Sequence, residues 1–401
     1  MRTGNVTQLA VKTAIAPDVR LALIASGCHS GSTMLDMMLG SHTAISGSGE
    51  MNRLTLYSDD RACTCGTPIA VCPYWTQVLG RLALAAGRET LRWSECHTDV
   101  PPFQPILELD ETSDLTLVEG EPVPARLASA LQHLGVALSP KATLTHGGVR
   151  DVKWRVLDEG GRELVIRREQ GRLQVYPPLF QWKNHLRKLP STLELALGVG
   201  AERSVEWLAK VSREAHTHLN AARNTWLVAE AMAASDRTQV VVDSSKSAIR
   251  LKLLYITRPQ SVRVIHLVRD GRAVAASDIR RRGRAPAIAA KVWKRENQHL
   301  RLVLGGIPAA QKHKVRYEDV CENPERELRL ICDFLSLDFE PGMLQLWDRA
   351  VHNVPGNPFL FKNRQHSIAK DDRWRRELSH DQLATIERIV GPLNRALGYS
   401  S

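Results

Sequence analysis

The sequence predicts an α/β fold that is built on a parallel sheet and carries a β-rich insertion. Three observations lead to this fold class. The apolar runs at 21–25, 239–242 and 262–268 have the composition of strands that are buried on both faces. Segments with helical spacing separate these runs, which is typical of a parallel sheet. Between the first two runs, residues 150–176 alternate in polarity around glycine turns, which indicates antiparallel strands.

The chain begins with a polar stretch and then enters its first strand. Residues 1–19 lack a compact apolar core before a small-residue cleavage site, so we expect a disordered N-terminal lead and not a signal peptide. The first part of the main domain, 20–100, opens with the strand at 21–25, and a helical pattern starts at Met34. The loop between them is rich in glycine and serine; its members are Gly27, Cys28, His29, Ser30, Gly31, Ser32 and Thr33.

This loop has the composition of a phosphate site. Glycines let backbone N–H groups close around an anion, and the helix N-terminus adds unpaired donors. A tight strand–helix turn without a ligand would show the same pattern. Nucleoside-triphosphatase loops place a Lys before the Ser or Thr that contacts Mg²⁺. No Lys precedes Ser32 or Thr33, so the loop suits a 5′-phosphate that bears one further group, and an NTP-dependent kinase is disfavoured.

The middle of the chain has a different character. A helix is expected at 76–92, and a polar, proline-rich stretch then marks a boundary. We take residues 101–190 as a β-rich insertion with a short helix at 126–134 and a β-meander at 150–176.

Residues 191–401 are expected to complete the main domain. They open with a long helical pattern at 201–234 and contain the second and third apolar runs. Right-handed crossovers place the C-terminal ends of parallel strands along one edge, where ligands bind. Residues 27–33, 243–246 and Arg269 are therefore expected at one crevice.

A second anion site is indicated at the end of the run 262–268. Arg269 follows this strand, and Ser277 lies two turns along the next helical pattern. The Arg offers a planar fork of donors and the Ser a short hydroxyl, so the two can converge on one phosphate.

The two segments together resemble a known family. HSGSTML (29–35) and VIHLVRDGRAVAAS (264–277) are similar to the two donor-binding signatures of the sulfotransferases that use 3′-phosphoadenosine-5′-phosphosulfate. Weaker similarity occurs in four shorter segments, which are VVVDSSKSA (240–248), VRYEDV (315–320, resembling a short strand), GNP (356–358) and DDRWRRELS (371–379). The resemblance implies a P-loop-like sulfotransferase fold. It also implies that residues 27–33 hold the 5′-phosphosulfate and that Arg269 and Ser277 hold the 3′-phosphate.

The resemblance suggests three catalytic candidates. Lys246 precedes Ser247 as in the catalytic turn of the family, and would place a cation near the bridging oxygen; an exposed loop lysine is the alternative. Glu50 matches a Glu that removes the acceptor's proton in some relatives; a capping or surface Glu is the alternative. His29 stands where many relatives have Arg or Lys. It could donate to the sulfuryl oxygens, act as a base, or be a loop residue only.

The resulting hypothesis is a sulfotransferase that moves a sulfuryl group to a hydroxyl of a small molecule or glycan, with no metal. The alternative is a catalytically inactive nucleotide- or nucleic-acid-binding protein on the same fold. The net charge is +11, and nine Lys/Arg against two Asp lie within 269–295. Few aromatic residues accompany these cations, so a local funnel for a polyanionic nucleotide is favoured over nucleic-acid binding.

Two further expectations concern the environment of the chain. No run of 18 or more apolar residues occurs, so no membrane span is predicted. Seven scattered cysteines do not suggest a disulfide scaffold, which favours the cytoplasm. Cys63, Cys65 and Cys72 could bind Zn²⁺ with a fourth ligand such as Cys96 or His97. The C-x-C-x₆-C spacing is unusual for zinc, and we expect packed thiols or a local disulfide instead.

Overall fold

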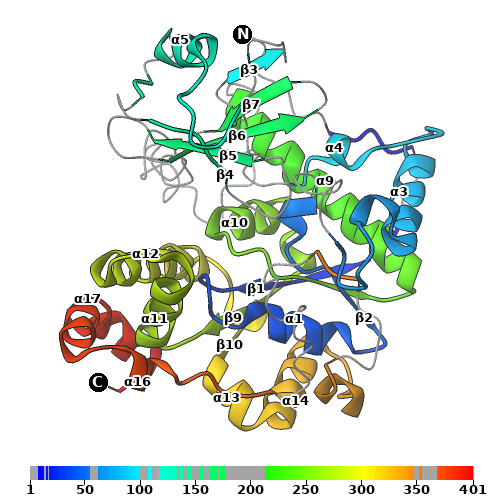
Figure 1. Ribbon diagram of the computed structural model, residues 1–401. Helices are drawn as coiled ribbons and strands as arrows, with labels where there is room; N and C mark the ends of the chain where they lie inside the picture. Colours follow the sequence, from blue (N-terminus) through cyan, green and yellow to red (C-terminus); the bar gives the residue numbers. More distant parts are fainter. Residues whose placement is uncertain are drawn as a thin grey trace. The chain divides into compact units, whose positions relative to one another are not determined.

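The structure is a computed structural model whose described part forms two compact units (Figure 1). It describes residues 8–12, 15–16, 18–54, 62–98, 107–110, 115, 117–133, 136–138, 142–146, 153–157, 163–169, 172–176, 213–346, 352–354 and 368–400. The larger unit comprises Asn5–Pro102 with Gly198–Ser401, and the smaller unit comprises Met1–Gly4 with Phe103–Leu197. The domain boundaries given above stay predictions.

A five-stranded sheet forms the centre of the larger unit. Its order is β10-β9-β1-β8-β2, and every neighbouring pair is parallel. The strands are β1 (Arg20–Ala25), β2 (Ile45–Gly47), β8 (Val240–Asp243), β9 (Val262–Val268) and β10 (Lys312–Arg316). The predicted α/β class with a parallel sheet is confirmed.

Helices connect these strands. The α-helices of the larger unit are α1 (Ser32–Gly40), α3 (Pro73–Ala85), α4 (Trp93–Cys96), α9 (Arg213–Asp236), α10 (Ala248–Thr257), α11 (Gly271–Arg282), α12 (Pro286–Gly305), α13 (Tyr317–Glu322), α14 (Pro324–Leu335), α16 (Trp374–Glu377) and α17 (His380–Leu397). Short 3-10 helices occur at Met51–Arg53, Ile69–Val71, Pro259–Ser261, Ala309–Gln311 and Pro341–Leu344.

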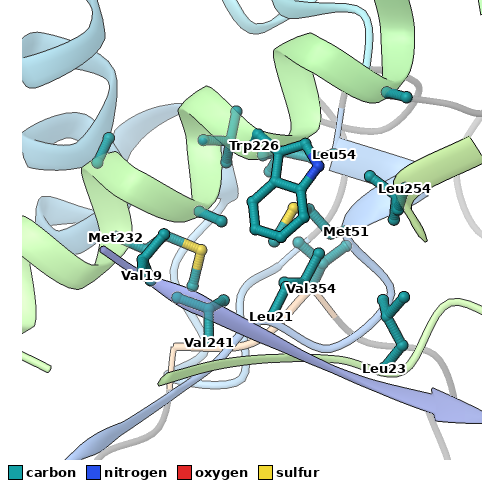
Figure 2. Packing of buried hydrophobic residues seen from close by; sticks show 14 of the residues in the cluster. Val19, Leu21, Leu23, Met51, Leu54, Trp226, Met232, Val241, Leu254 and Val354 are labelled. Atoms are coloured by element: carbon teal, nitrogen blue, oxygen red, sulfur yellow. The ribbon is translucent and has the colours of Figure 1, made fainter. Parts of the chain in front are cut away.

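Both faces of the parallel sheet are buried. Leu21 and Leu23 of β1 belong to the same apolar cluster as Trp226 of α9, and Figure 2 shows the indole packed above the strand. The intervening side chains, Ala22 and Ile24, belong to a second cluster with α1 and α14. Helices on both faces explain why β1 is an uninterrupted apolar run. The strand ends are thereby fixed by packing, and they support the loops at the C-terminal edge.

In the part of the smaller unit that the structure describes, there are an antiparallel sheet of order β3-β7-β6-β5-β4 and one helix. Its elements are β3 (Leu107–Asp110), α5 (Ala125–His133), β4 (Thr145–His146), β5 (Lys153–Leu157), β6 (Glu163–Glu169) and β7 (Arg172–Tyr176). Alternate side chains, including Leu164, Ile166, Leu173 and Val175, form a buried cluster. The structure therefore has antiparallel strands where the β-meander was predicted.

Three predicted elements differ in extent. The segment 315–320 is not a strand throughout, because β10 ends at Arg316 and α13 begins at Tyr317 with two acidic residues in its first turn. The helix expected at 76–92 runs from Pro73 to Ala85 and is followed by Gly87 with a φ of +65°. Residues 201–212 of the helix expected at 201–234 lie outside the described residues. The separate segment GNP (356–358) also lies outside them. Among the helices that the structure describes, none has the length and apolar character to cross a bilayer.

Candidate active site

The loop after β1 has the backbone geometry of an anion site. His29 has a φ of 60° and Gly31 a φ of 88°, so left-handed residues alternate with Ser30. Such a run directs successive N–H groups to one concave side. Glycine is needed at position 31, because a Cβ there would lie 2.4 Å from the ring of Tyr317. The loop leads into α1, whose first-turn N–H groups need partners from outside the helix.

Polar groups in this loop are buried without partners of their own. The hydroxyl of Ser32 and that of Ser26 have no hydrogen-bond partner among the described residues, and Ser32 is only 1% exposed. The Cys28 N–H donates to Oε2 of Glu296 at 3.0 Å. A Cβ at Gly27 would lie 3.1 Å from the same oxygen. A carboxylate from α12 therefore sits against the loop, at a place suited to an anionic oxygen.

Arg269 connects the two predicted anion sites. Its guanidinium donates to the carbonyl of His29 at 2.9 Å and to the carbonyl of Asp371 at 2.8 Å. It also lies over the ring of Tyr317, 4.2 Å from the centroid. The side chain is 7% exposed, so these contacts fix it in a largely dry position. The structure thus brings Arg269 to the loop, as the crevice prediction required.

The side chains of α11 complete this side of the site. Ser277 is buried on α11, next to Asp278. Asp278 Oδ1 lies 3.4 Å from Nε2 of His29, and Asp278 Oδ2 accepts from Arg284 at 2.8 Å. Burial raises the pKa of Asp278, but the contacts with His29 and Arg284 outweigh burial and bring it below its ordinary value. Burial lowers the pKa of His29, so its ring is neutral near pH 7.

Glu50 and Lys246 form an ion pair. Glu50 follows β2 and Lys246 follows β8, and these strands are neighbours in the sheet. The other oxygen of Glu50 lies 2.6 Å from Nε of Arg53. Glu50 is buried, and two cations favour its carboxylate form.

The ion pair lies near the loop 27–33. Burial raises the pKa of the Cys28 thiol to about 11, and the charges of Glu296, Lys246 and Glu50 also act on it. The three catalytic candidates, His29, Glu50 and Lys246, therefore gather at the C-terminal edge of the sheet.

No role was predicted from the sequence for three site residues, although two of them lie in the similar segments 315–320 and 371–379. Glu296, Tyr317 and Asp371 contact the loop or Arg269, but each is far from its partner along the chain. No spacing rule links them. Arg373, considered above only as part of a C-terminal motif, pairs with Asp371 at 2.7 Å and is exposed.

Comparisons with known proteins show similarity to one family. Residues 167–341 match the model described as the sulfotransferase family, and this segment contains Lys246, Arg269 and Ser277. The similarity to the sulfotransferase family thus covers the second part of the chain, which contains the strand-end Arg269.

Individual relatives are more distant. Carbohydrate sulfotransferase 1 of Danio rerio is 28% identical over 92 residues, which are 22% of this chain and 21% of that protein, so the match spans about a fifth of the relative's length. The sulfotransferase domain of the curacin biosynthetic pathway is similar with a TM-score of 0.43 and 16% identity, over 97% of this chain and 99% of that one. The sulfotransferase domain of the Synechococcus PCC 7002 olefin synthase gives 0.43 and 17%, over 95% and 98%.

Proposed function

We propose that this protein transfers a sulfuryl group from 3′-phosphoadenosine-5′-phosphosulfate to a hydroxyl of a small molecule or glycan. The observation that carries the proposal is the hydrogen bond from Arg269 to the carbonyl of His29, because it joins two segments that are predicted to bind anions and lie 240 residues apart. The donor has phosphate groups on both sides of its ribose and needs two such segments side by side. The match to the sulfotransferase family supports the same chemistry.

The loop residues fit the donor. The unpartnered hydroxyl of Ser32, with Thr33 and the loop N–H groups, would face the 5′-phosphosulfate. Arg269 and Ser277 would face the 3′-phosphate. The Cys28 N–H already donates to the carboxylate of Glu296, which shows that it can bind an anionic oxygen. We expect the donor to replace this carboxylate when it binds.

Two residues would perform the transfer. The acceptor oxygen forms a bond to sulfur while the bond from sulfur to the bridging oxygen breaks, and the electron pair goes to the 5′-phosphate. Lys246 stabilises that developing charge. Glu50 takes the acceptor's proton. The two residues pair with each other, so a bound donor would draw Lys246 away and free one oxygen of Glu50 while Arg53 still holds the other.

His29 suits a positioning role better than a chemical one. Its carbonyl accepts from Arg269, and its Nε2 faces Asp278. A neutral ring with its proton on Nε2 has only an acceptor at Nδ1, so it cannot also donate to the sulfuryl oxygens. We therefore assign His29 to holding the loop against β9 and α11.

The acceptor class rests on the weaker comparisons. The curated relative is named as a carbohydrate sulfotransferase, which supports glycan hydroxyls as the first acceptors to try. The segment 101–190 is a candidate for acceptor selection, since variable segments carry specificity on shared folds.

The test combines donor binding with product detection. Calorimetry should show that adenosine 3′,5′-bisphosphate binds more tightly than adenosine 5′-monophosphate, which lacks the 3′-phosphate. Incubation with the donor and a panel of glycans and small hydroxyl compounds should yield products heavier by one SO₃ group, detected by mass spectrometry. Lys246→Ala should remove product and keep nucleotide binding, while Lys252→Ala, on the following helix, should keep both.

The outcomes separate the two candidate functions. Tight nucleotide binding without any product across the panel would favour the catalytically inactive nucleotide-binding alternative. Equal binding of the two nucleotides would contradict the proposed 3′-phosphate site, and full turnover by Lys246→Ala would remove this lysine from the mechanism.

A further inference from the structure

Three cysteines and one histidine meet at a place that the proposed transfer does not use. Cys63, Cys65, Cys72 and His352 each offer one ligand atom, and these atoms all lie within 4.8 Å of one another. The Sγ atoms of Cys65 and Cys72 are 3.7 Å apart. The Nδ1 atom of His352 lies 3.4 Å from Sγ of Cys72 and 3.7 Å from Sγ of Cys63.

Three of these separations match the edges of a tetrahedral zinc site. With Zn–S bonds of about 2.3 Å and a Zn–N bond of about 2.0 Å, a regular tetrahedron has S–S edges of about 3.8 Å and S–N edges of about 3.5 Å. The three measured separations, at 3.7, 3.4 and 3.7 Å, lie within a few tenths of an ångström of those edges.

We propose that Cys63, Cys65, Cys72 and His352 bind one Zn²⁺ ion as a closed, structural Cys₃His site. All four tetrahedral positions are supplied by the protein, so no position remains open for a substrate. Three thiolates and an imidazole suit zinc better than calcium or magnesium, which prefer oxygen ligands.

The backbone around the cysteines is shaped to hold such an ion. The Cys63 N–H donates to the Thr67 carbonyl at 2.7 Å, and the Gly66 N–H returns to the Cys63 carbonyl at 2.8 Å. This tight turn brings Cys63 and Cys65 together, and their Sγ atoms lie within 4.8 Å of each other.

Cys72 lies at a helix N-terminus. It stands directly before α3, and its side chain makes no capping hydrogen bond to the first turn. The positive end of a helix of 13 residues favours negative charge at this position.

The imidazole is oriented by its neighbours. The ring of His352 stacks on Tyr74 with centroids 4.9 Å apart and 15° between the planes. The hydroxyl of Tyr74 is itself fixed, because it donates to Asp236 at 2.9 Å. The adjacent Asn353 N–H donates to the hydroxyl of Thr64 at 2.9 Å. These contacts hold Nδ1 toward the sulfurs before any metal binds.

The fourth ligand corrects one expectation from the sequence. Cys96 and His97 were the candidates, but the described cluster contains His352 in their place. A Cys65–Cys72 disulfide would need the sulfurs at about 2.05 Å and would give His352 and Cys63 no role. Zinc uses all four groups.

If the proposed function holds, the ion also supports the proposed base. Val354 donates to the Ser48 carbonyl at 2.9 Å, and the Glu50 N–H donates to the Val354 carbonyl at 3.0 Å. A metal bound by His352 would therefore fix the short backbone segment that carries Glu50. This consequence rests on the proposed function, whereas the zinc site itself does not.

The test measures metal and thiols in the full chain, purified with any affinity tag removed. We expect one zinc ion per chain by plasma mass spectrometry, and seven reactive thiols after denaturation with a chelator, as the sequence contains seven cysteines. Cys65→Ser should lose the zinc. His352→Cys should keep it, because a fourth thiolate replaces the imidazole. Cys321→Ser, which removes a thiol outside the cluster, should also keep it.

Two results would overturn the site. Five thiols without zinc would show a disulfide, and seven thiols without zinc after incubation with Zn²⁺ would show packed thiols only. If Cys65→Ser does not fold, the wild-type chain loaded with Co²⁺ gives a second measurement. Thiolate-to-cobalt absorption with tetrahedral visible bands supports the site, and an octahedral spectrum refutes it. Nucleotide calorimetry on the same sample keeps this outcome separate from the proposed donor site.

Discussion

Replacing Arg269 by alanine should weaken both the folded state and nucleotide binding, by amounts that the contacts allow us to work out. The guanidinium makes two charge-assisted hydrogen bonds to carbonyls and one contact with an aromatic ring. Such hydrogen bonds contribute roughly 1.5–3 kcal/mol each, and the ring contact about 1 kcal/mol. Water entering the vacated space recovers part of this. We expect a loss of about 3 kcal/mol in the free energy of unfolding.

The same substitution should remove a phosphate contact. Truncating one partner of a buried charge pair costs about 2–5 kcal/mol, which is roughly 30-fold to several thousand-fold in the dissociation constant. Calorimetry with adenosine 3′,5′-bisphosphate measures this, and urea unfolding measures the stability. Adenosine 5′-monophosphate, which lacks the 3′-phosphate, should lose much less affinity.

Arg263→Ala is the matched control, because it removes the same charge from β9, the strand that Arg269 directly follows. Arg263 is half-buried, and among the described residues it donates only to carbonyls near it in sequence, those of Gln260 and Val262. We expect it to change both quantities by less than about 1 kcal/mol. A folded Arg269→Ala protein that binds the bisphosphate as tightly as the Arg263→Ala control would refute the assignment of Arg269 to the donor.

Four other predictions follow from the same contacts. Glu50→Gln should lower turnover by roughly 10²- to 10⁴-fold in a product assay while nucleotide affinity is kept; unchanged turnover would show that another group is the base. Gly31→Ala should reduce the midpoint of thermal unfolding far more than Gly283→Ala. Both positions have a positive φ, but only at position 31 would a Cβ lie against the Tyr317 ring, at 2.4 Å. Equal shifts in the midpoint would show that the loop can move to accommodate the Cβ. Burial lowers the pKa of His266 to about 4, and nearby cations add to the effect. In the unfolded chain the histidine has a pKa of about 6.5, so it is protonated at a higher pH than His266 in the folded protein. The contribution of His266 to the free energy of unfolding is therefore fully present above pH 6.5 and is lost as the pH drops toward 4. Urea unfolding should show a fall of about 2 kcal/mol in the free energy of unfolding between pH 7 and pH 5 from this histidine. The His266→Gln protein should show a fall that is smaller by that amount. Glu296→Gln should tighten nucleotide binding roughly tenfold in calorimetry, since it keeps an acceptor for the loop and removes a like charge; weaker binding would show that the carboxylate organises the loop for the ligand.

The parts of the fold that the sequence predicts well depend on local patterns. The strand β9 occupies the whole apolar run 262–268, because a strand buried on both faces cannot tolerate polar residues. The loop before α1 was readable because its geometry requires glycine at position 31. Both signals lie within a few neighbouring residues.

Contacts between distant segments leave no such signal. Glu296 reaches Cys28 across 268 residues, and His352 reaches Cys63 across 289. A single histidine or glutamate in a helix or short strand looks like any other until the chain is folded. The segment 315–320 was expected to resemble one short strand of the family, and that resemblance does not reveal that the strand ends at Arg316.

The charges around the loop suggest how one site can hold a highly charged donor without a metal from solution. Lys246 pairs with Glu50, Arg269 lies 3.6 Å from the carboxylate of Asp371, and the loop N–H of Cys28 binds Glu296. Lys246, Arg269 and the Cys28 N–H, which we assign to the donor, thus each lie against an acidic side chain. Buried cations keep their position only when they are paired. Binding would then be an exchange of carboxylates for phosphate and sulfate oxygens, and the cations would need little movement, because the strands that carry them are fixed by packing on both faces of the sheet.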